Sequence, residues 1–442
     1  MDRKNVFDAP PWKAIVTLGI PSLISIMVML LYNMTDMYFI SYSGDLNQVA
    51  AVSLAGPVFN LMMALSTMIG NGGCTRTAQA LGRGDGEALR KISSLCFWSS
   101  AVVGVIFAGC CFVAITPLLK LLGTSGETWD FTRKYVLVMA AGAPVVLINH
   151  SMTAMLRGQG FVKLSLIASL ISTVSNMVLD PIFILLLDMG VLGAAVATVL
   201  GNMASVFYVW LYWRKYRERC VLEFRPVYAW DFRELGRILI LGLPNAVNSL
   251  LNSVTGTFSN HMLADYGASV IAAMSAAGKG PMIAIMVQMG LCMGVQPLMA
   301  YCHGRKRWEK LKVILKDMVI LLLTVGTVLT MGLWLCRTNA VSLFIRETEM
   351  ASLSAKMMEF QLLMCPLLGL YFLGGNLLQS TDNPTGAVVS TLLRSVLLVP
   401  MMALLGSAFG LMGLVVSHTA ADGAALSITA AITAVHMRKN MK

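Results

Sequence analysis

The sequence has 442 residues, of which 57% are hydrophobic and only 12% are charged. A soluble globular chain carries about 25% charged residues, so this composition and the mean hydropathy of +0.73 exclude a cytosolic enzyme, a disordered chain and a secreted disulfide scaffold. The net charge of +11 would suit nucleic acid, but the basic residues stand between apolar runs, which is typical of membrane topology.

Long apolar runs in chain order predict an all-α polytopic membrane protein. A spanning helix needs about 20 mostly apolar residues, and a β-barrel would show short alternating segments instead. Twelve runs qualify as transmembrane helices 1 to 12: 14–40, 50–75, 93–119, 133–156, 163–187, 191–213, 236–264, 270–301, 311–336, 357–379, 386–408 and 410–436.

The distribution of Lys and Arg predicts the orientation of these helices. Of the 33 basic residues, 25 fall on the side of the two termini and six on the opposite side. Short cytoplasmic loops carry the excess of Lys and Arg. Both termini are therefore expected in the cytoplasm of a multi-pass protein of the plasma membrane, which in a bacterium is the inner or cytoplasmic membrane.

The chain repeats a six-helix unit. The segment 18–21 (Leu-Gly-Ile-Pro) returns at 241–244 as Leu-Gly-Leu-Pro, and 190–193 (Gly-Val-Leu-Gly) returns at 410–413 as Gly-Leu-Met-Gly. Six helices per copy give a parallel repeat with a pseudo-two-fold axis along the membrane normal, and transporters of this construction bind substrate between their lobes. The predicted domains are an N-terminal lobe (1–213), a basic cytoplasmic linker (214–235) and a C-terminal lobe (236–442).

Four polar residues of the N-terminal lobe are candidates for coupling to a cation: Asp36, Asn176, Asp180 and Asn202. An ionisable residue inside the membrane is costly and indicates function. Asn176 and Asp180 share a helix face because they are four residues apart. Two carboxylates close together do not both ionise easily, so one would hold a proton. Alternatively, Asp36 and Asp180 would be ligands of Na⁺. A structural role in cross-linking helices stays open for both.

Further positions are candidates for a hinge and for a substrate cavity. Pro21 lies inside helix 1, where it removes a backbone hydrogen bond, so it is either a hinge or a static kink. Helix 7 has a polar face that would line a cavity or bond to other helices. The candidate cavity residues are Phe59, Met63, Met152, Met155, Asn248, Asn252 and Gln288.

Ionisable residues of the C-terminal lobe have no assigned task. Asp422 aligns with Asn202 in the repeat, and His418 lies one turn earlier. This pair would be a second titrating site or, more simply, a structural contact. Arg394 is expected to hold helices together, and the role of Lys279 stays open.

Several ordered motifs resemble the multidrug and toxic compound extrusion (MATE) family. They include the first-helix run 31–36 (Leu-Tyr-Asn-Met-Thr-Asp), 157–160 with 176–181, and 294–297 with Tyr301. The resemblance implies a twelve-helix antiporter that exports drugs against a proton or sodium gradient, with Asp36 as the first-helix acid. Helix 7 lacks the carboxylate of one branch, which favours the DinF-like branch. The family's Tyr-Asn-Tyr-Gly reads Tyr-Cys-His-Gly at 301–304.

These observations predict a cation-coupled (H⁺ or Na⁺) multidrug efflux antiporter that exports amphipathic, mostly cationic compounds by alternating access and so confers antibiotic resistance. The alternative is a lipid-linked saccharide flippase of the same wider superfamily, for which the predicted cavity has few charges. A membrane enzyme would need metal motifs that do not occur. We therefore expect no cofactor, no nucleic acid partner, small-molecule drugs as partners, and a monomer in the bilayer.

Overall fold

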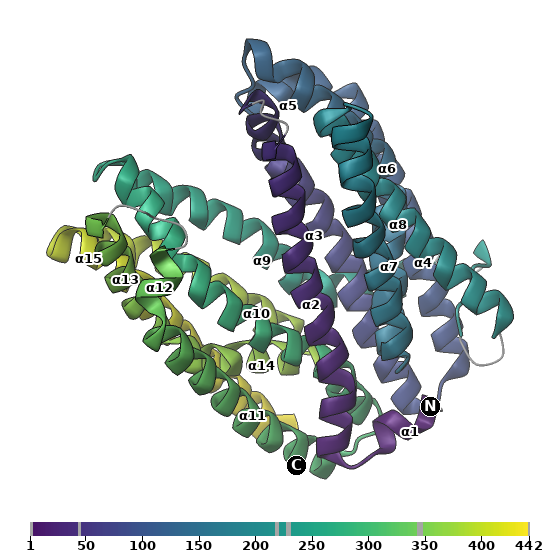
Figure 1. The fold of residues 1–442 in the computed structure, drawn as a ribbon. Helices are drawn as coiled ribbons and strands as arrows, with labels where there is room; N and C mark the ends of the chain where they lie inside the picture. The colour runs from purple at the N-terminus through teal and green to yellow at the C-terminus, as the bar shows by residue number, and fades with distance from the viewer. Residues whose placement is uncertain (1–2, 43–45, 217–220, 227–230, 343–347, 441–442) are drawn as a thin grey trace. The chain divides into compact units, whose positions relative to one another are not determined.

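The computed structural model describes residues 3–42, 46–216, 221–226, 231–342 and 348–440. Within these ranges, the side chains of 3–5, 33–34, 36–38, 40–42, 46, 253 and 268 lie outside the description. The regular elements of the described chain are all helices, as the composition predicts (Figure 1).

The helices of the first half follow one another with short connections. They are α1 (Arg3–Asp8), α2 (Pro11–Tyr42), α3 (Leu46–Arg83), α4 (Gly86–Val113), α5 (Ile115–Leu121), α6 (Gly126–Gly158), α7 (Val162–Pro181), the π-helix η1 (Ile182–Leu186) and α8 (Gly190–Lys215). The second half comprises α9 (Phe232–Ala264), α10 (Ala268–Gly304), α11 (Trp308–Leu335), α12 (Arg337–Ser342), α13 (Thr348–Leu362), α14 (Cys365–Ser380) and α15 (Pro384–Asn440).

The long apolar helices of the described chain correspond to twelve membrane spans. Ten helices are long and apolar enough to cross a membrane, and α13 and α14 form an eleventh span bent by 45°. The 57 residues of α15 would extend about 85 Å at 1.5 Å per residue, far beyond a bilayer core of about 30 Å. Its two helices meet at Gly410, whose φ of 59° and ψ of −139° suit a glycine. The prediction of twelve transmembrane helices is confirmed.

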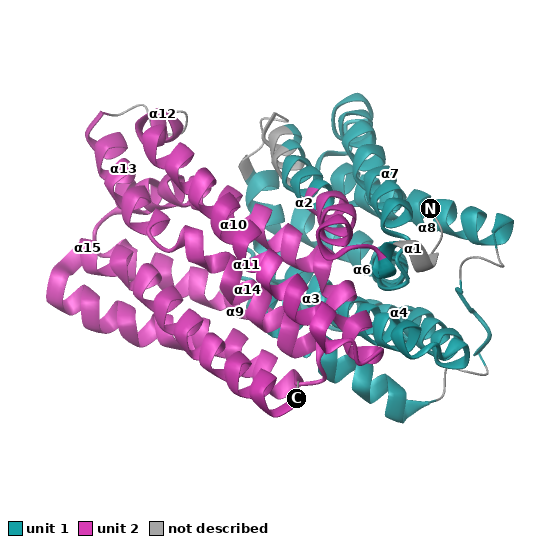
Figure 2. Ribbon diagram, turned by 90° about the horizontal axis from the view of Figure 1, so that it is seen from below, with its two compact units in different colours: residues 1–8, 24–249 teal, residues 9–23, 250–442 magenta. Residues whose placement is uncertain are grey.

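Packing divides the chain into two compact units (Figure 2). Unit 1 comprises residues 1–8 and 24–249, and unit 2 comprises residues 9–23 and 250–442. This division differs from the lobes predicted by the repeat at the first half of α2 and at the first half of α9. In both helices the change of unit comes shortly after a proline, Pro21 in α2 and Pro244 in α9.

Glycines explain why these two half-helices pack as they do. In unit 1, a Cβ atom at Gly242 of α9 would collide with the carbonyl group of Met68 on α3. In unit 2, a Cβ atom at Gly294 of α10 would lie 2.6 Å from the Leu18 carbonyl oxygen and 2.8 Å from Gly19 Cα on α2. The helices therefore touch backbone to backbone, and the repeated Leu-Gly-x-Pro motif supplies this contact in both units.

The described part of the predicted linker is bound to unit 1. Gln159 pairs with the backbone of Val221 in both directions, donating to its carbonyl at 2.9 Å and accepting from its N–H at 3.2 Å. The Trp98 indole donates to the Phe224 carbonyl at 2.9 Å, and the Phe224 ring packs edge-on against Trp213. Residues 221–226 are thus fixed to the helices of this unit.

Candidate functional site

A carboxylate and an amide lie buried one turn apart on α7. Asp180 and Asn176 are 0% and 3% exposed. The Asn176 amide is assigned the orientation in which its nitrogen donates to Asp180 Oδ2 at 2.8 Å and its oxygen accepts from Thr198 Oγ1 at 3.1 Å, because only this orientation satisfies both ends. One amide therefore connects the carboxylate of α7 to a hydroxyl of α8.

The connection continues from α8 to α6. Asn202 Nδ2 donates to the Thr198 carbonyl at 2.8 Å, and Asn149 Nδ2 donates to Asn202 Oδ1 at 2.8 Å. Ser205 Oγ donates to Asn149 Oδ1 at 2.7 Å. These hydrogen bonds join three spanning helices through a set that we call the unit 1 polar chain: Asp180, Asn176, Thr198, Asn202, Asn149 and Ser205.

The unit 1 polar chain includes three of the four residues predicted for cation coupling. The fourth, Asp36, lies in α2, and its side chain is outside the described residues. Tyr32, one helical turn before Asp36, has its hydroxyl 3.3 Å from Thr198 Oγ1. The sequence did not single out Asn149, Thr198 or Ser205. In the sequence, each of these three is only a polar residue within an apolar run, and this does not reveal which helix lies next to it.

The backbone after Asp180 departs from α-helical geometry. Pro181 ends α7, and the π-helix η1 follows directly. A proline has no N–H and cannot complete the α-helical hydrogen bond at its position. Single π-turns occur frequently at functional sites. The wider turn here places the irregular backbone next to the buried carboxylate.

The predicted cavity residues of unit 1 lie in packed surroundings. Met152 and Met155 are 1% and 0% exposed and belong to a hydrophobic core cluster with Ile69 and Leu95. Phe59 and Met63 are half-buried and pack against a second core cluster. Met152 and Met155 are on α6, which packs against α3, α4 and α8, and this central position explains their burial.

The predicted residues of helices 7 and 8 have separate positions. Asn248 is half-buried and belongs to unit 1, whereas Asn252 belongs to unit 2. Gln288 is buried between α10 and α14, where it donates to the Cys365 carbonyl at 2.8 Å and accepts from the Gly369 N–H at 2.8 Å. Its contacts therefore join two helices. Lys279 is exposed on α10.

A cavity of about 330 Å³ lies within unit 2. Asn252 lines it, and so do Arg394, Asp422 and His418. Arg394 Nε donates to Asp422 Oδ1 at 2.6 Å, so the residue predicted to align with Asn202 has an arginine as its partner. His418 Nε2 is 3.4 Å from Ser259 Oγ.

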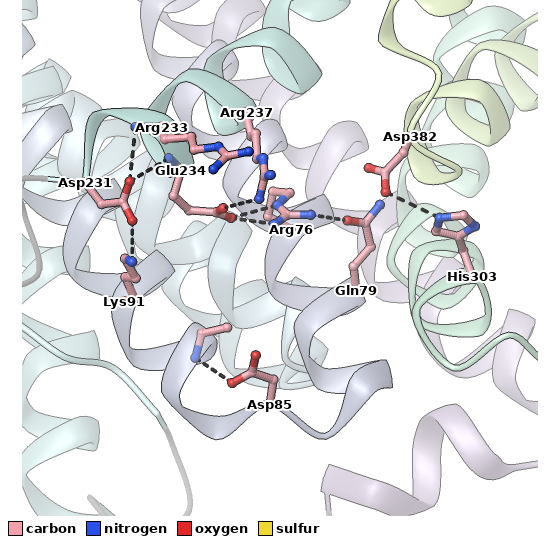
Figure 3. A network of polar contacts seen from close by, with 11 residues as sticks. Arg76, Gln79, Asp85, Lys91, Asp231, Arg233, Glu234, Arg237, His303 and Asp382 are labelled. Carbon is pink, nitrogen blue, oxygen red and sulfur yellow. Dashed lines mark hydrogen bonds and ion pairs between the residues drawn. The ribbon is translucent and has the colours of Figure 1, made fainter.

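An ion-pair cluster holds the start of α9 in unit 1 (Figure 3). Arg76 of α3 donates from Nε to Glu234 Oε1 at 2.8 Å, and its Nη2 forms an ion pair with the same oxygen at 2.7 Å. Lys91 pairs with Asp231, and this lysine hydrogen bond lowers the pKa of the Asp231 carboxyl. Asp231 Oδ1 also accepts the N–H of Glu234 at 3.0 Å, so the cluster caps α9 as well as fixing it.

Twelve spanning helices, an internal repeat and a buried carboxylate inside a spanning segment define a multi-pass membrane transporter. The family model described as MatE matches residues 21–182 and 244–404, one segment in each copy of the repeat. The chain belongs to this family, which confirms the family resemblance; assignment to the DinF-like branch stays a prediction.

Curated relatives and solved structures agree with this membership. The chain is 29% identical to the "Multidrug export protein MepA" of Staphylococcus saprophyticus over 95% of its own length and 92% of the relative's. It is 27% identical to the protein of the same name from Staphylococcus aureus, over 98% and 95%.

A solved structure has the same fold. It is described as "Outward-facing conformation of a multidrug resistance MATE family transporter of the MOP superfamily", and the TM-score is 0.92 at 24% identity, over 98% of this chain and 97% of that one. The relatives are transporters, and this chain is accordingly a transporter and not an enzyme.

Proposed function

We propose that the chain is a cation-coupled multidrug efflux antiporter. It exports amphipathic, mostly cationic compounds by alternating access in exchange for H⁺ or Na⁺. The names of its relatives support the substrate class, since they are multidrug export proteins. The observation that carries the proposal is the unit 1 polar chain, in which a fully buried carboxylate of α7 is connected through the Asn176 amide to polar groups of α8 and α6.

The chemistry of the unit 1 polar chain suits reversible binding of a small cation. Burying a charge in an apolar environment is costly, which favours a proton or a bound Na⁺ at the buried carboxylate of Asp180. Carboxylate and amide oxygens are the ligands that a hard cation prefers. Asp36 enters the proposal from the sequence, as the carboxylate one turn beyond Tyr32 on α2.

Efflux from liposomes tests the coupling. Purified protein is reconstituted, a pH gradient or a Na⁺ gradient is applied separately, and ethidium efflux is followed by fluorescence. Asp36→Asn should abolish gradient-driven efflux, because an amide neither exchanges a proton in the working pH range nor supplies a charge to Na⁺. Asp180→Asn should impair efflux less, since Asp36 remains.

Asp188→Asn is the matched control. Asp188 is exposed just beyond η1, and its φ of 50° is one that asparagine also adopts, so efflux should be unchanged. An Asp36→Asn protein that pumps at the wild-type rate would contradict coupling through unit 1 and redirect attention to Asp422 and His418. A wild-type protein that moves no cation under either gradient would favour the flippase.

Cysteine labelling tests the proposed cytoplasmic position of the termini. In a cysteine-free background, a single cysteine at Thr124, between α5 and α6, should react with an impermeant maleimide added to intact bacterial cells. One at Arg225, whose side chain is 68% exposed, should react only after the membrane is opened. The reverse pattern would invert the topology.

Light scattering of the purified protein would establish whether it is a monomer.

A further inference from the structure

The cavity of unit 2 contains a half-buried ion pair that the proposed coupling through unit 1 does not use. Its volume of about 330 Å³ lies within the range of about 300–1,000 Å³ that is typical of ligand sites. Arg394 and Asp422 both line it, with side chains 25% and 14% exposed. They form two hydrogen bonds, Nε to Oδ1 at 2.6 Å and Nη2 to Oδ2 at 3.4 Å.

The guanidinium of Arg394 has donors to offer a ligand. It carries five N–H bonds, of which two are directed at Asp422. Among the described residues, the others have no hydrogen-bond acceptor, and the Tyr371 ring centroid lies 5.9 Å from the guanidinium carbon. Taking two charges out of water costs several kcal/mol per ion. An ion pair that only joined helices could be replaced by apolar residues at little loss, whereas a binding site needs its charges.

The rest of the cavity suits a small amphipathic molecule. Hydroxyl and amide side chains surround the ion pair, and Met274, Leu398 and Ala421 add apolar surface. His418 is the one further titratable side chain of the described lining. The polar members are Asn252, Thr255, Ser259, Asn260, Ser275 and Ser395.

We propose that this cavity binds an organic zwitterion, whose carboxylate pairs with Arg394 and whose cationic nitrogen group pairs with Asp422. The proposal rests on the proposed function and adds a substrate class to it. A zwitterion exchanges one ion pair within the protein for two pairs with the ligand, so no charge is left alone. A simple cation would pair with Asp422 and leave Arg394 unpaired beside it, at the cost of like-charge repulsion. A simple anion would do the converse.

Two dyes that differ by one methyl group test the proposal. Rhodamine 110 is zwitterionic in neutral buffer, and its methyl ester, rhodamine 123, is a cation. Binding of each dye to the purified full-length protein in detergent is followed by fluorescence polarisation. Arg394→Gln should weaken rhodamine 110 binding at least tenfold and leave rhodamine 123 binding unchanged or tighter, because Asp422 is then free to pair with the cation. Arg438→Gln, at an exposed position of α15, should change neither.

A second variant keeps the test decisive if the single change impairs folding. Arg394→Gln/Asp422→Asn leaves no unpaired charge and should bind the two dyes equally, so that the ratio of their dissociation constants approaches one. Rhodamine 110 binding at the wild-type level in both variants would overturn the proposal, and so would a wild-type protein without preference for the zwitterion. Ethidium efflux by the wild-type protein tests the proposed function separately, so efflux without zwitterion preference would refute only the site proposed here.

Discussion

Replacing Glu234 by glutamine should destabilise the protein more than the same kind of change at the neighbouring acid, Asp231. Glu234 accepts a hydrogen bond from Arg76 Nε and forms an ion pair with Arg76 Nη2, and the two side chains are 12% and 10% exposed. Removing one partner of a buried ion pair costs about 3–5 kcal/mol, because the other charge stays buried and unpaired. We expect the lower end, about 3 kcal/mol, since both side chains keep some contact with solvent.

The expected change in melting temperature follows from the size of the folding unit. A destabilisation of 1 kcal/mol lowers the melting temperature of a unit of about 150–250 residues by about 2–4 °C. Glu234→Gln should therefore lower the apparent melting temperature of the purified protein by about 6–12 °C. Intrinsic tryptophan fluorescence and the loss of monodisperse protein on size exclusion would both follow the transition.

Asp231→Asn is the matched control for this prediction. The Lys91–Asp231 pair is more exposed, with side chains 37% and 29% accessible, and such pairs contribute about 0–1 kcal/mol. Asparagine can still cap α9. The double change Arg76→Gln/Glu234→Gln should recover part of the loss, because it leaves no unpaired charge. Equal shifts for the two single acid variants, or a double variant as unstable as the sum of its parts, would refute this reasoning.

Three further predictions concern packing and pH. Gly242→Ala should abolish the yield of folded protein, because its Cβ collides with a carbonyl of α3, whereas Gly236→Ala on the same helix meets nothing within 4 Å and should express normally. Gln288→Leu should lower the melting temperature, since it strips two buried backbone groups of their partner at about 1–3 kcal/mol each. The pKa of Asp231 is lowered in the folded protein, so its ionised carboxyl stabilises the fold at pH values above its ordinary pKa near 4. This stabilisation is lost as the pH falls through the pKa of the folded state. Melting temperatures measured from pH 7 to 3 should show this loss, and Asp231→Asn should remove it.

Part of the candidate site was predictable because its residues share a helix. Asn176 and Asp180 are four residues apart within an apolar run, so the helical period places them on one face. The chain of hydrogen bonds through Thr198 to Asn149 was not predictable, because it depends on which helices are neighbours. A single Thr or Asn in an apolar run gives the same sequence pattern whether its side chain bonds to another helix or to its own backbone. The ion pair between Arg394 and Asp422 was hidden for the same reason.

The internal repeat was also predictable from the sequence, whereas the packing of its helices was not. Two copies of Leu-Gly-x-Pro indicated a duplicated six-helix unit, and the MatE model matches each copy separately. The motif alone did not indicate that the backbone of another helix packs directly against its glycine. In unit 1, Gly242 meets α3, and in unit 2, Gly19 meets Gly294 of α10. Each first helix therefore begins in one unit and continues in the other. The chain passes between the units in the short connection at residues 8–9 and again inside α2 and α9, so a rearrangement of the units involves these two helices as well as that connection. Pro21 and Pro244 lie near those crossings and leave a carbonyl one turn earlier without its N–H partner, which is why the hinge proposed for Pro21 should have a counterpart at Pro244.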